Sequence, residues 1–201
     1  MKLNKIEQII KKAKCISVSE SEECQWVGDG FCLYPIYDLP HLSQGEFFTL
    51  FDIPDSKRGD FCFNVMDLPE SLNFKDNDPS ELLLERGDYT VNLQGRTLEI
   101  LPSRHGMTFI DTKYLKPFSG TEEGFELYER ISADGTAYIA VKEGLFLIGI
   151  IMPFDLHNDE KLIDTLDKLK RCAEAFRDYR ETLNTEPAQT EFDTDEGDEV
   201  Q

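Results

Sequence analysis

The chain has 201 residues, a formal net charge of −19 and 40% hydrophobic residues. This length corresponds to one domain or two, and the hydrophobic content is sufficient for a packed core. The acidic balance argues against general coating of nucleic acid, because the neutralisation of phosphates requires clustered Lys and Arg. Five cysteines without a C-x-x-C pair indicate reduced thiols in a cytoplasmic protein rather than a disulfide framework.

Residues 3–13 are expected to form a short amphipathic helix, because apolar residues recur there at helical spacing. The segment is basic in an acidic chain, with five lysines and one glutamate in residues 1–14, and it lacks the long apolar run of a signal peptide. A solvated helix face is the simpler interpretation. The alternative is a basic surface that contacts nucleic acid, the only such surface expected in this chain. Its candidate residues are Lys5, Lys11, Lys12 and Lys14.

The next part of the chain is expected to consist of strands. Apolar alternation and aromatic or β-branched runs place them at residues 15–19, 25–27, 31–36, 46–53 and 60–66. Gly28-Asp29-Gly30 is typical of a hairpin turn between the second and third of these segments. A polar turn at residues 54–59 joins the last two.

Residues 78–118 are expected to hold one short helix and a further group of strands. Asp78-Pro79-Ser80-Glu81 resembles a helix start, with an Asp cap and Pro at the first position, and the helix is expected to end at Gly87. Gly95 is expected in the turn of a hairpin. The strands are placed at residues 89–94, 96–101 and 107–110, and residues 114–118 lead out of the sheet.

The most apolar stretch of the chain, residues 137–154, predicts the centre of the fold. Its sequence, AYIAVKEGLFLIGIIMPF, is typical of a hairpin in which Gly144 takes up positive φ. The second arm, residues 145–152, is apolar at nearly every position, so we expect a central strand with both faces covered. The alternating segment 125–131 is expected to complete a three-stranded meander with this hairpin.

The C-terminal part is expected to contain a long helix and an acidic tail. Apolar residues at spacings of three and four predict a helix from about Asn158 to Leu183. Residues 184–201 contain seven acids and no Lys or Arg, which predicts a disordered tail. The fold class expected is α+β: a single domain of residues 1–183 with a mainly antiparallel sheet, an N-terminal helix and a long C-terminal helix.

Two segments of the chain contain the tripeptide RGD. RGDFCFNV (58–65) and RGDYTVNL (86–93) also share an aromatic residue and an Asn at equal spacing. One interpretation is an exposed cell-adhesion motif, but Gly and Asp are common in turns that lead into strands, and nothing marks the chain as secreted. The longer match leaves open an internal duplication beside a chance similarity.

No catalytic constellation is found in the sequence, and no cofactor or metal is expected. There is no nucleophile elbow, Gly-rich phosphate loop or H-E-x-x-H motif. His41, His105 and His157 lie in expected loops, without a Cys or acid at metal-ligand spacing. His105 has Ser103 and Arg104 beside it and is a candidate general base, but a solvated loop histidine is the simpler interpretation. Enzymatic activity is therefore not favoured, although the sequence leaves it open.

Three blocks of the chain carry a resemblance to known proteins. QWVGDGFCLYPI (25–36), FIDTKYLKPF (109–118) and AYIAVKEGLFLIGIIMPF (137–154) resemble blocks of small uncharacterised proteins from phages and mobile elements of Gram-positive gut bacteria. The resemblance covers roughly residues 1–176. It implies a cytoplasmic accessory protein and supplies no catalytic residue.

The chain also resembles DNA sliding clamps, which have acidic outer sheets, helices lining a basic lumen, and a strand ending in an IMP-like sequence near the C-terminus. Here Ile151-Met152-Pro153 ends the expected central strand. The chain departs from the clamps because it is too short for a three-domain subunit and continues beyond Pro153.

The leading expectation is a non-enzymatic interaction or accessory protein with a protein partner and no membrane association. The alternative is a clamp-like DNA-processivity or DNA-associated factor. The sequence leaves the oligomeric state open.

Overall fold

The computed structural model of the chain describes residues 1–155 except Asp88, Gln94 and residues 121–123, and it also describes Lys168, Arg171, Cys172 and Ala175. The chain divides into two units, Met1–Phe154 and Asp155–Gln201. The four described residues beyond position 155 are helical. The rest of the expected C-terminal helix, and the whole expected tail at residues 184–201, lie outside the described residues.

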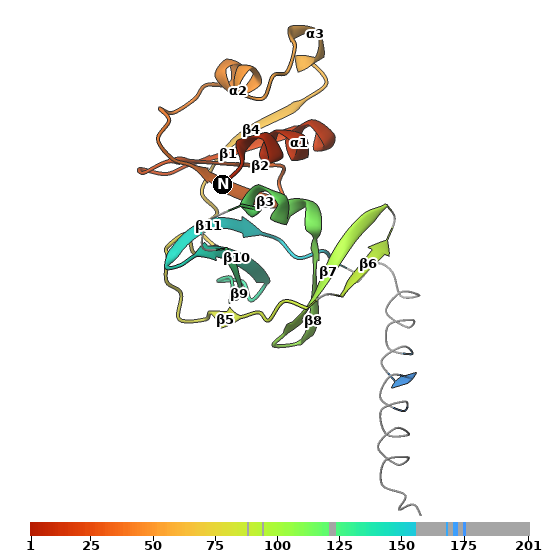
Figure 1. Cartoon of the computed structure of the whole chain (residues 1–201). Helices are drawn as coiled ribbons and strands as arrows, with labels where there is room; N and C mark the ends of the chain where they lie inside the picture. Colours follow the sequence, from red (N-terminus) through yellow and green to blue (C-terminus); the bar gives the residue numbers. More distant parts are fainter. Residues whose placement is uncertain are drawn as a thin grey trace, which may run out of the picture. The chain divides into compact units, whose positions relative to one another are not determined.

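An eight-stranded sheet forms the body of the first unit (Figure 1). Its strands are β1 (Cys15–Glu20), β2 (Gln25–Gly28), β3 (Cys32–Ile36), β4 (Cys62–Asp67), β5 (Leu82–Leu83), β9 (Glu126–Ile131), β10 (Ala137–Glu143) and β11 (Phe146–Ile151). Their order across the sheet is β4-β1-β2-β3-β11-β10-β9-β5. Only β1 and β4 pair in parallel, so the expected mainly antiparallel α+β fold is confirmed for this unit.

A smaller antiparallel sheet contains β6 (Thr90–Leu93), β7 (Arg96–Ser103) and β8 (Gly106–Asp111). The expected hairpin around Gly95 and the strand after it are therefore confirmed. The RGD-containing segments lead into strands of different sheets, β4 in the large sheet and β6 in the small one. An internal duplication based on these segments stays a prediction.

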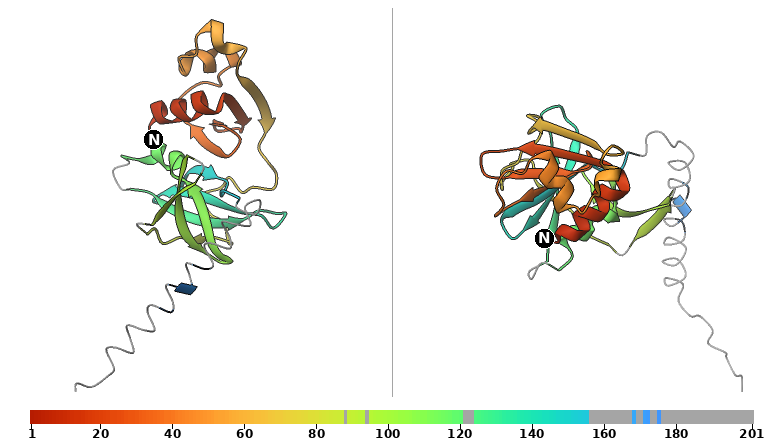
Figure 2. Two further views of the ribbon diagram at one scale, coloured as in Figure 1. Left: turned by 90° about the vertical axis from the view of Figure 1, so that its right-hand side faces the viewer. Right: turned by 90° about the horizontal axis from the view of Figure 1, so that it is seen from above.

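The helices of the first unit are short. They are α1 (Leu3–Ala13), α2 (Gln44–Leu50), α3 (Asp55–Arg58) and the 3₁₀ helix η1 (Thr112–Phe118). The expected N-terminal helix is confirmed as α1, with Ile6, Ile9 and Ile10 buried against the sheet. Figure 2 shows α1 and α2 over the strands of the N-terminal half.

The large sheet contains the same local order of elements twice. α1 is followed by the meander β1-β2-β3, and η1 is followed by the meander β9-β10-β11. The last strands of the two meanders, β3 and β11, pair antiparallel in the middle of the sheet. The two helices also meet, because the backbone N–H of Lys2 donates to the carbonyl oxygen of Pro117 at 2.7 Å. The sheet therefore brings two distant chain segments into one helical layer.

Each face of the large sheet has its own apolar core, as β10 shows. Successive residues of a strand point to opposite faces. Ile139 and Val141 belong to the core that also contains the buried residues of α1, α2 and η1. Tyr138 and Ala140 belong to the second core, which includes Trp26. A strand in this position needs apolar residues on both sides, which explains the nearly continuous apolar sequence of residues 137–154.

The expected central strand is confirmed as β11, which pairs with β3 on one side and β10 on the other. Gly144 has a φ of 59° in the preceding turn, as the sequence predicts. The pairing of β10 with β11 contains a bulge, in which Ile148 is passed over between the partners of Val141 and Lys142. Next to it, Gly149 leaves room for Phe118 of η1, whose ring would overlap any Cβ at this position.

The expected strand at residues 46–53 is wrong, because most of this segment is helix α2. Ser43 and Glu46 form a capping box: the Glu46 carboxylate accepts from the Ser43 backbone N–H at 2.7 Å. Such a box marks a helix start, although the aromatic sequence EFFTLF that follows Gly45 is typical of a strand. Phe47 and Phe51 are one helical turn apart and both are buried. The expected turn at residues 54–59 contains α3.

The expected helix after Asp78 is also wrong. Asp78 accepts hydrogen bonds from the backbone N–H and the hydroxyl of Ser80, as an N-cap residue does. The chain then extends instead of coiling, because β5 pairs with β9 and Leu84 is buried. Tertiary pairing therefore overrides a local helix signal. The segment 114–118, expected to lead out of the sheet, is part of η1.

Candidate functional site

Four large apolar side chains are exposed at one end of the large sheet, and we call them the hairpin-end surface. They are Tyr37, Leu39, Leu145 and Phe146, with exposed fractions of 52%, 43%, 75% and 68%. Single exposed apolar residues are common on soluble proteins, whereas a group of four at one place is a feature of interaction surfaces.

Strand pairing brings these residues together from two parts of the chain. β3 ends at Ile36 and runs antiparallel to β11, so the residues after β3 approach the start of β11. The hydroxyl of Tyr37 donates to the carbonyl oxygen of Leu147 at 3.5 Å. Asp38 has a φ of 63°, a conformation that turns the chain between Tyr37 and Leu39.

Carboxylates surround the hairpin-end surface. Burial raises the pKa of Tyr37, and Cys24 and the carboxylates of Asp76 and Glu23 raise it further. Asp76 also accepts a hydrogen bond from the backbone N–H of Leu147 at 2.8 Å. Asp38 and Glu143 lie within the two segments themselves, and neither residues 36–39 nor residues 143–147 contain a Lys or Arg. The surface is therefore apolar and its rim is mainly acidic, with the exposed Lys75 beside Asp76 as a basic residue.

A buried arginine holds part of this rim in place. Arg130 of β9 has no exposed surface, and its guanidinium donates to the carbonyl oxygens of Asn73, Lys75 and Asp76 at 2.8–3.0 Å. It also forms an ion pair with Glu81. Lys142 of β10 lies 3.3 Å from the same carboxylate, so Glu81 also balances the charge of this lysine. These contacts fix the irregular segment that carries Asp76.

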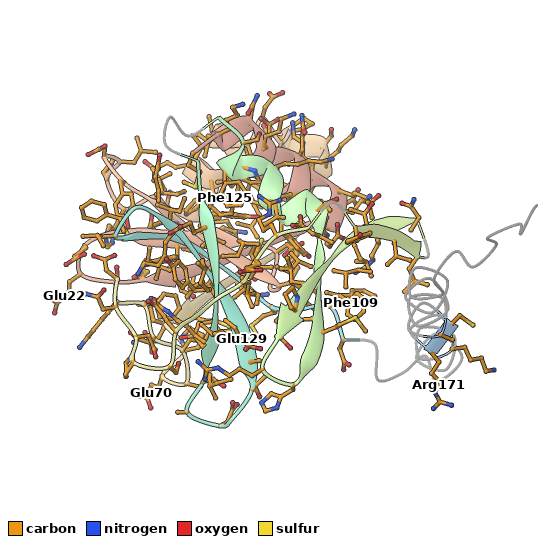
Figure 3. The ribbon with its side chains drawn as sticks, turned by 60° about the horizontal axis from the view of Figure 1, so that its bottom comes forward. Glu22, Glu70, Phe109, Phe125, Glu129 and Arg171 are labelled. Carbon is orange, nitrogen blue, oxygen red and sulfur yellow. The ribbon has the colours of Figure 1, made fainter. Side chains whose placement is uncertain are left out.

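Not all acids of the first unit contribute to its surface charge. Three of these acids are buried and have cationic partners: Glu129, Glu99 and Asp29. Two others, Glu22 and Glu70, are exposed at the periphery. Figure 3 shows this contrast for Glu22, Glu70 and Glu129. The pair of Glu99 with Arg86 is bidentate, with distances of 2.7 and 2.9 Å.

The lysines predicted to form a basic surface lie on α1 or at its C-terminal end. Lys11 pairs with Glu7 at 2.7 Å and with Asp52 at 3.8 Å, and Lys14 pairs with Asp60 at 3.6 Å. The ammonium group of Lys5 donates to the side chain of Gln8, and Lys12 is exposed. Two of the four predicted residues are thus matched by acids, while Lys5 and Lys12 have no acidic partner among the described residues.

The structure adds two lysines to this surface that the sequence analysis missed. Lys113 and Lys116 belong to η1, which lies beside α1. Lys113 pairs with Asp29 at 3.5 Å, whereas Lys116 is exposed. In the sequence, the only indication of a basic helix here is the KYLK pattern in the block 109–118. The position of η1 next to α1 depends on the tertiary fold. Of the lysines within α1 and η1, Lys5, Lys12 and Lys116 have no acidic partner among the described residues.

The other candidate residues are not brought together. His41 and His105 are exposed, with His105 in the turn between β7 and β8, and His157 lies outside the described residues. Within the described part of the chain, no group of three His, Cys, Asp or Glu is placed to hold a metal ion. The arginines of both RGD segments are engaged, Arg58 with Asp55 at 2.9 Å and Arg86 with Glu99.

Comparison of the chain with protein-family models, curated proteins and solved structures finds no match in any of the three. Among the described residues, no helix has the length and apolarity needed to span a membrane. The geometry of the described surfaces is therefore the basis for a functional proposal.

Proposed function

We propose that the chain is a non-enzymatic protein-interaction or accessory module that acts in the cytoplasm of a host carrying a phage or mobile element. The observation that carries this proposal is the hairpin-end surface. Grouped exposed apolar side chains mark interaction sites, and aromatic side chains are typical anchors of protein interfaces. The origin in a phage or mobile element rests on the resemblance of the three sequence blocks.

The three blocks support the fold rather than a catalytic site. Asp29 of the first block accepts a hydrogen bond from Tyr114 of the second at 3.0 Å. Phe118 of the second block packs over Gly149 of the third. β3 and β11 join the first and third blocks in the centre of the sheet. The three blocks thus pack on one another in the middle of the large sheet. The hairpin-end surface lies at the solvent-exposed end of the β3–β11 pair.

Affinity capture from a host lysate tests the proposal, with wild type compared with the double variant Leu145→Ser, Phe146→Ser. Both side chains are mostly exposed, so the variant is expected to keep its stability while losing its partner. A matched control, Tyr89→Ser with Met107→Ser, removes two exposed apolar side chains elsewhere. Equal capture by all three proteins, or turnover of a small molecule without any captured partner, would contradict the proposal.

A second candidate function is contact with DNA, as in a clamp-like or DNA-associated factor. The specific observation in its favour is that the adjacent helices α1 and η1 of an acidic protein carry Lys5, Lys12 and Lys116 without an acidic partner among the described residues. Binding through lysines to phosphates weakens steeply as salt rises. Duplex binding measured by fluorescence anisotropy at several salt concentrations tests it, with Lys5→Glu and Lys12→Glu as variants. A clamp-like ring further requires an oligomer in sedimentation.

A further inference from the structure

β4 forms one edge of the eight-stranded sheet, and most of its residues are exposed. Its only pairing partner in the described part of the chain is β1 (Figure 2). Val65 and Met66 have exposed fractions of 58% and 50%. The sequence CFNVMD contains no Pro or Lys, the residues that commonly prevent edge strands from pairing with other chains.

The free side of β4 presents a regular set of backbone groups. The N–H of Cys62 donates to the carbonyl oxygen of Lys14, so Cys62 is directed toward β1. Because successive residues of a strand direct their backbone groups to opposite sides, Phe63, Val65 and Asp67 direct theirs to the free edge. No hydrogen bond to these six N–H and C=O groups is found within the described residues.

We infer that this edge pairs with β4 of a second copy of the chain, forming an antiparallel contact across a two-fold axis at Val65. This interface is separate from the hairpin-end surface of the proposed function. The symmetric pairing sets Val65 opposite Val65 of the second copy and Phe63 opposite Asp67. β-branched residues opposite each other are a favourable cross-strand pair. Within β4 no like charges face each other.

Charge is the reason to choose a second copy at this edge rather than elsewhere on the molecule. Two chains of net charge −19 repel, and they approach most easily where the surface is neutral. β4 carries a single charged residue, Asp67, which lies beside Glu20 of β1, and Asp60 just before β4 is paired with Lys14. Screening of the remaining repulsion by salt is expected to tighten the dimer.

The contact area of two short strands is below that of a tight complex, so the dissociation constant is expected at about 10–100 µM. Sedimentation equilibrium of the full chain, with reductant to keep Cys62 as a thiol, is the first measurement. We expect a monomer–dimer equilibrium that tightens at least twofold between low and high salt. A monomer at several hundred micromolar, or a dimer that weakens with salt, overturns the inference.

Hydrogen exchange identifies the interface itself. At high protein concentration the amides of Phe63, Val65 and Asp67 are expected to gain protection, whereas those of Asn64 and Met66 are already bonded to β1. Val65→Pro removes one outward N–H without touching the β1 ladder, and it is expected to weaken dimerisation at least tenfold. Val65→Lys is the second variant, in case the proline variant fails to fold.

Leu145→Ser serves as the control for both measurements, because it changes the hairpin-end surface and leaves β4 intact. It is expected to dimerise like wild type. A variant that loses its partner but still dimerises therefore separates the proposed function from this inference. Dimerisation without new protection at the three outward amides overturns strand pairing. Protection of these amides only when a different protein is added would assign the edge to that partner instead.

Discussion

The hydroxyl of Tyr114 in η1 donates a hydrogen bond of 3.0 Å to a carboxylate oxygen of Asp29, in the turn between β2 and β3. The other oxygen of this carboxylate accepts from the backbone N–H of Phe31 at 3.1 Å and from the thiol of Cys32 at 3.4 Å. The contact joins η1 to the turn between β2 and β3 through a buried carboxylate. Such a group is held in place only while its donors remain.

Removal of this carboxylate should be costly. Asp29→Ala leaves the Tyr114 hydroxyl without its acceptor and Lys113 without its counter-ion, so we expect the free energy of unfolding to fall by about 3 kcal/mol. Tyr114→Phe removes one of several donors and is expected to cost about 1–2 kcal/mol. Chemical denaturation of both variants checks these values. Equal losses in the two would contradict the central place of Asp29.

Stability should decrease at alkaline pH. Burial, with a contribution from the Asp29 carboxylate, raises the pKa of the Cys32 thiol well above its ordinary value. The native thiol keeps its proton where the unfolded chain loses it, so the free energy of unfolding should fall as the pH rises above about 8.5. Burial raises the pKa of Tyr114 as well, which adds a further fall above about pH 10.

Cys32→Ser tests this pH dependence. The variant is expected to differ from wild type by a constant amount between pH 6 and pH 8. Between about pH 8.5 and pH 10 its free energy of unfolding should fall less steeply than that of wild type, because the titrating thiol is absent. Parallel curves over the whole range would show that Cys32 does not contribute.

A methyl group at position 149 should disrupt the packing between η1 and β11. A Cβ atom on Gly149 would overlap Cζ of Phe118 and lie 3.0 Å from Cε1 of the same ring. Gly149→Ala is therefore expected to cost about 1–3 kcal/mol, and Phe118→Leu in the same chain should recover part of the loss. The control is Gly45→Ala in α2, where nothing lies within 4 Å of the added atom. It should be neutral or slightly stabilising.

Loss of the buried guanidinium should release the segment beside the hairpin end. Arg130→Ala removes the donors to Asn73, Lys75 and Asp76 and leaves Glu81 with one fewer partner, at an expected cost of about 3–5 kcal/mol. Arg130→Lys should not restore stability, because a single ammonium cannot reach all these acceptors. Limited proteolysis should then cut within residues 70–81. Protection equal to wild type would mean that other contacts hold the segment.

The amount of this structure that could be predicted follows the strength of the local pattern. The alternation of residues 125–131 and the apolar run of residues 145–152 are long signals, and both gave the correct strands. EFFTLF has strand composition, yet Ser43 and Glu46 make it a helix, and the capping box was available in the sequence. The helix expected after Asp78 failed for a reason outside the sequence pattern, because β5 pairs with β9.

The surfaces were less accessible to prediction than the strands. The lysines of α1 were recognised, but Lys116 joins them only because η1 lies beside α1, about a hundred positions away in the chain. Tyr37 and Leu147 likewise meet only through the pairing of β3 with β11. Such sites depend on which strands become neighbours, and no local spacing encodes that choice.

Hydrogen exchange of the chain in complex with its captured partner tests the central claim most directly. We expect the partner to protect residues 36–39 and 143–147, and the Leu145→Ser, Phe146→Ser variant to lose this protection together with binding. Protection confined to α1 and η1, with the hairpin-end residues exchanging as in the free chain, would contradict the claim.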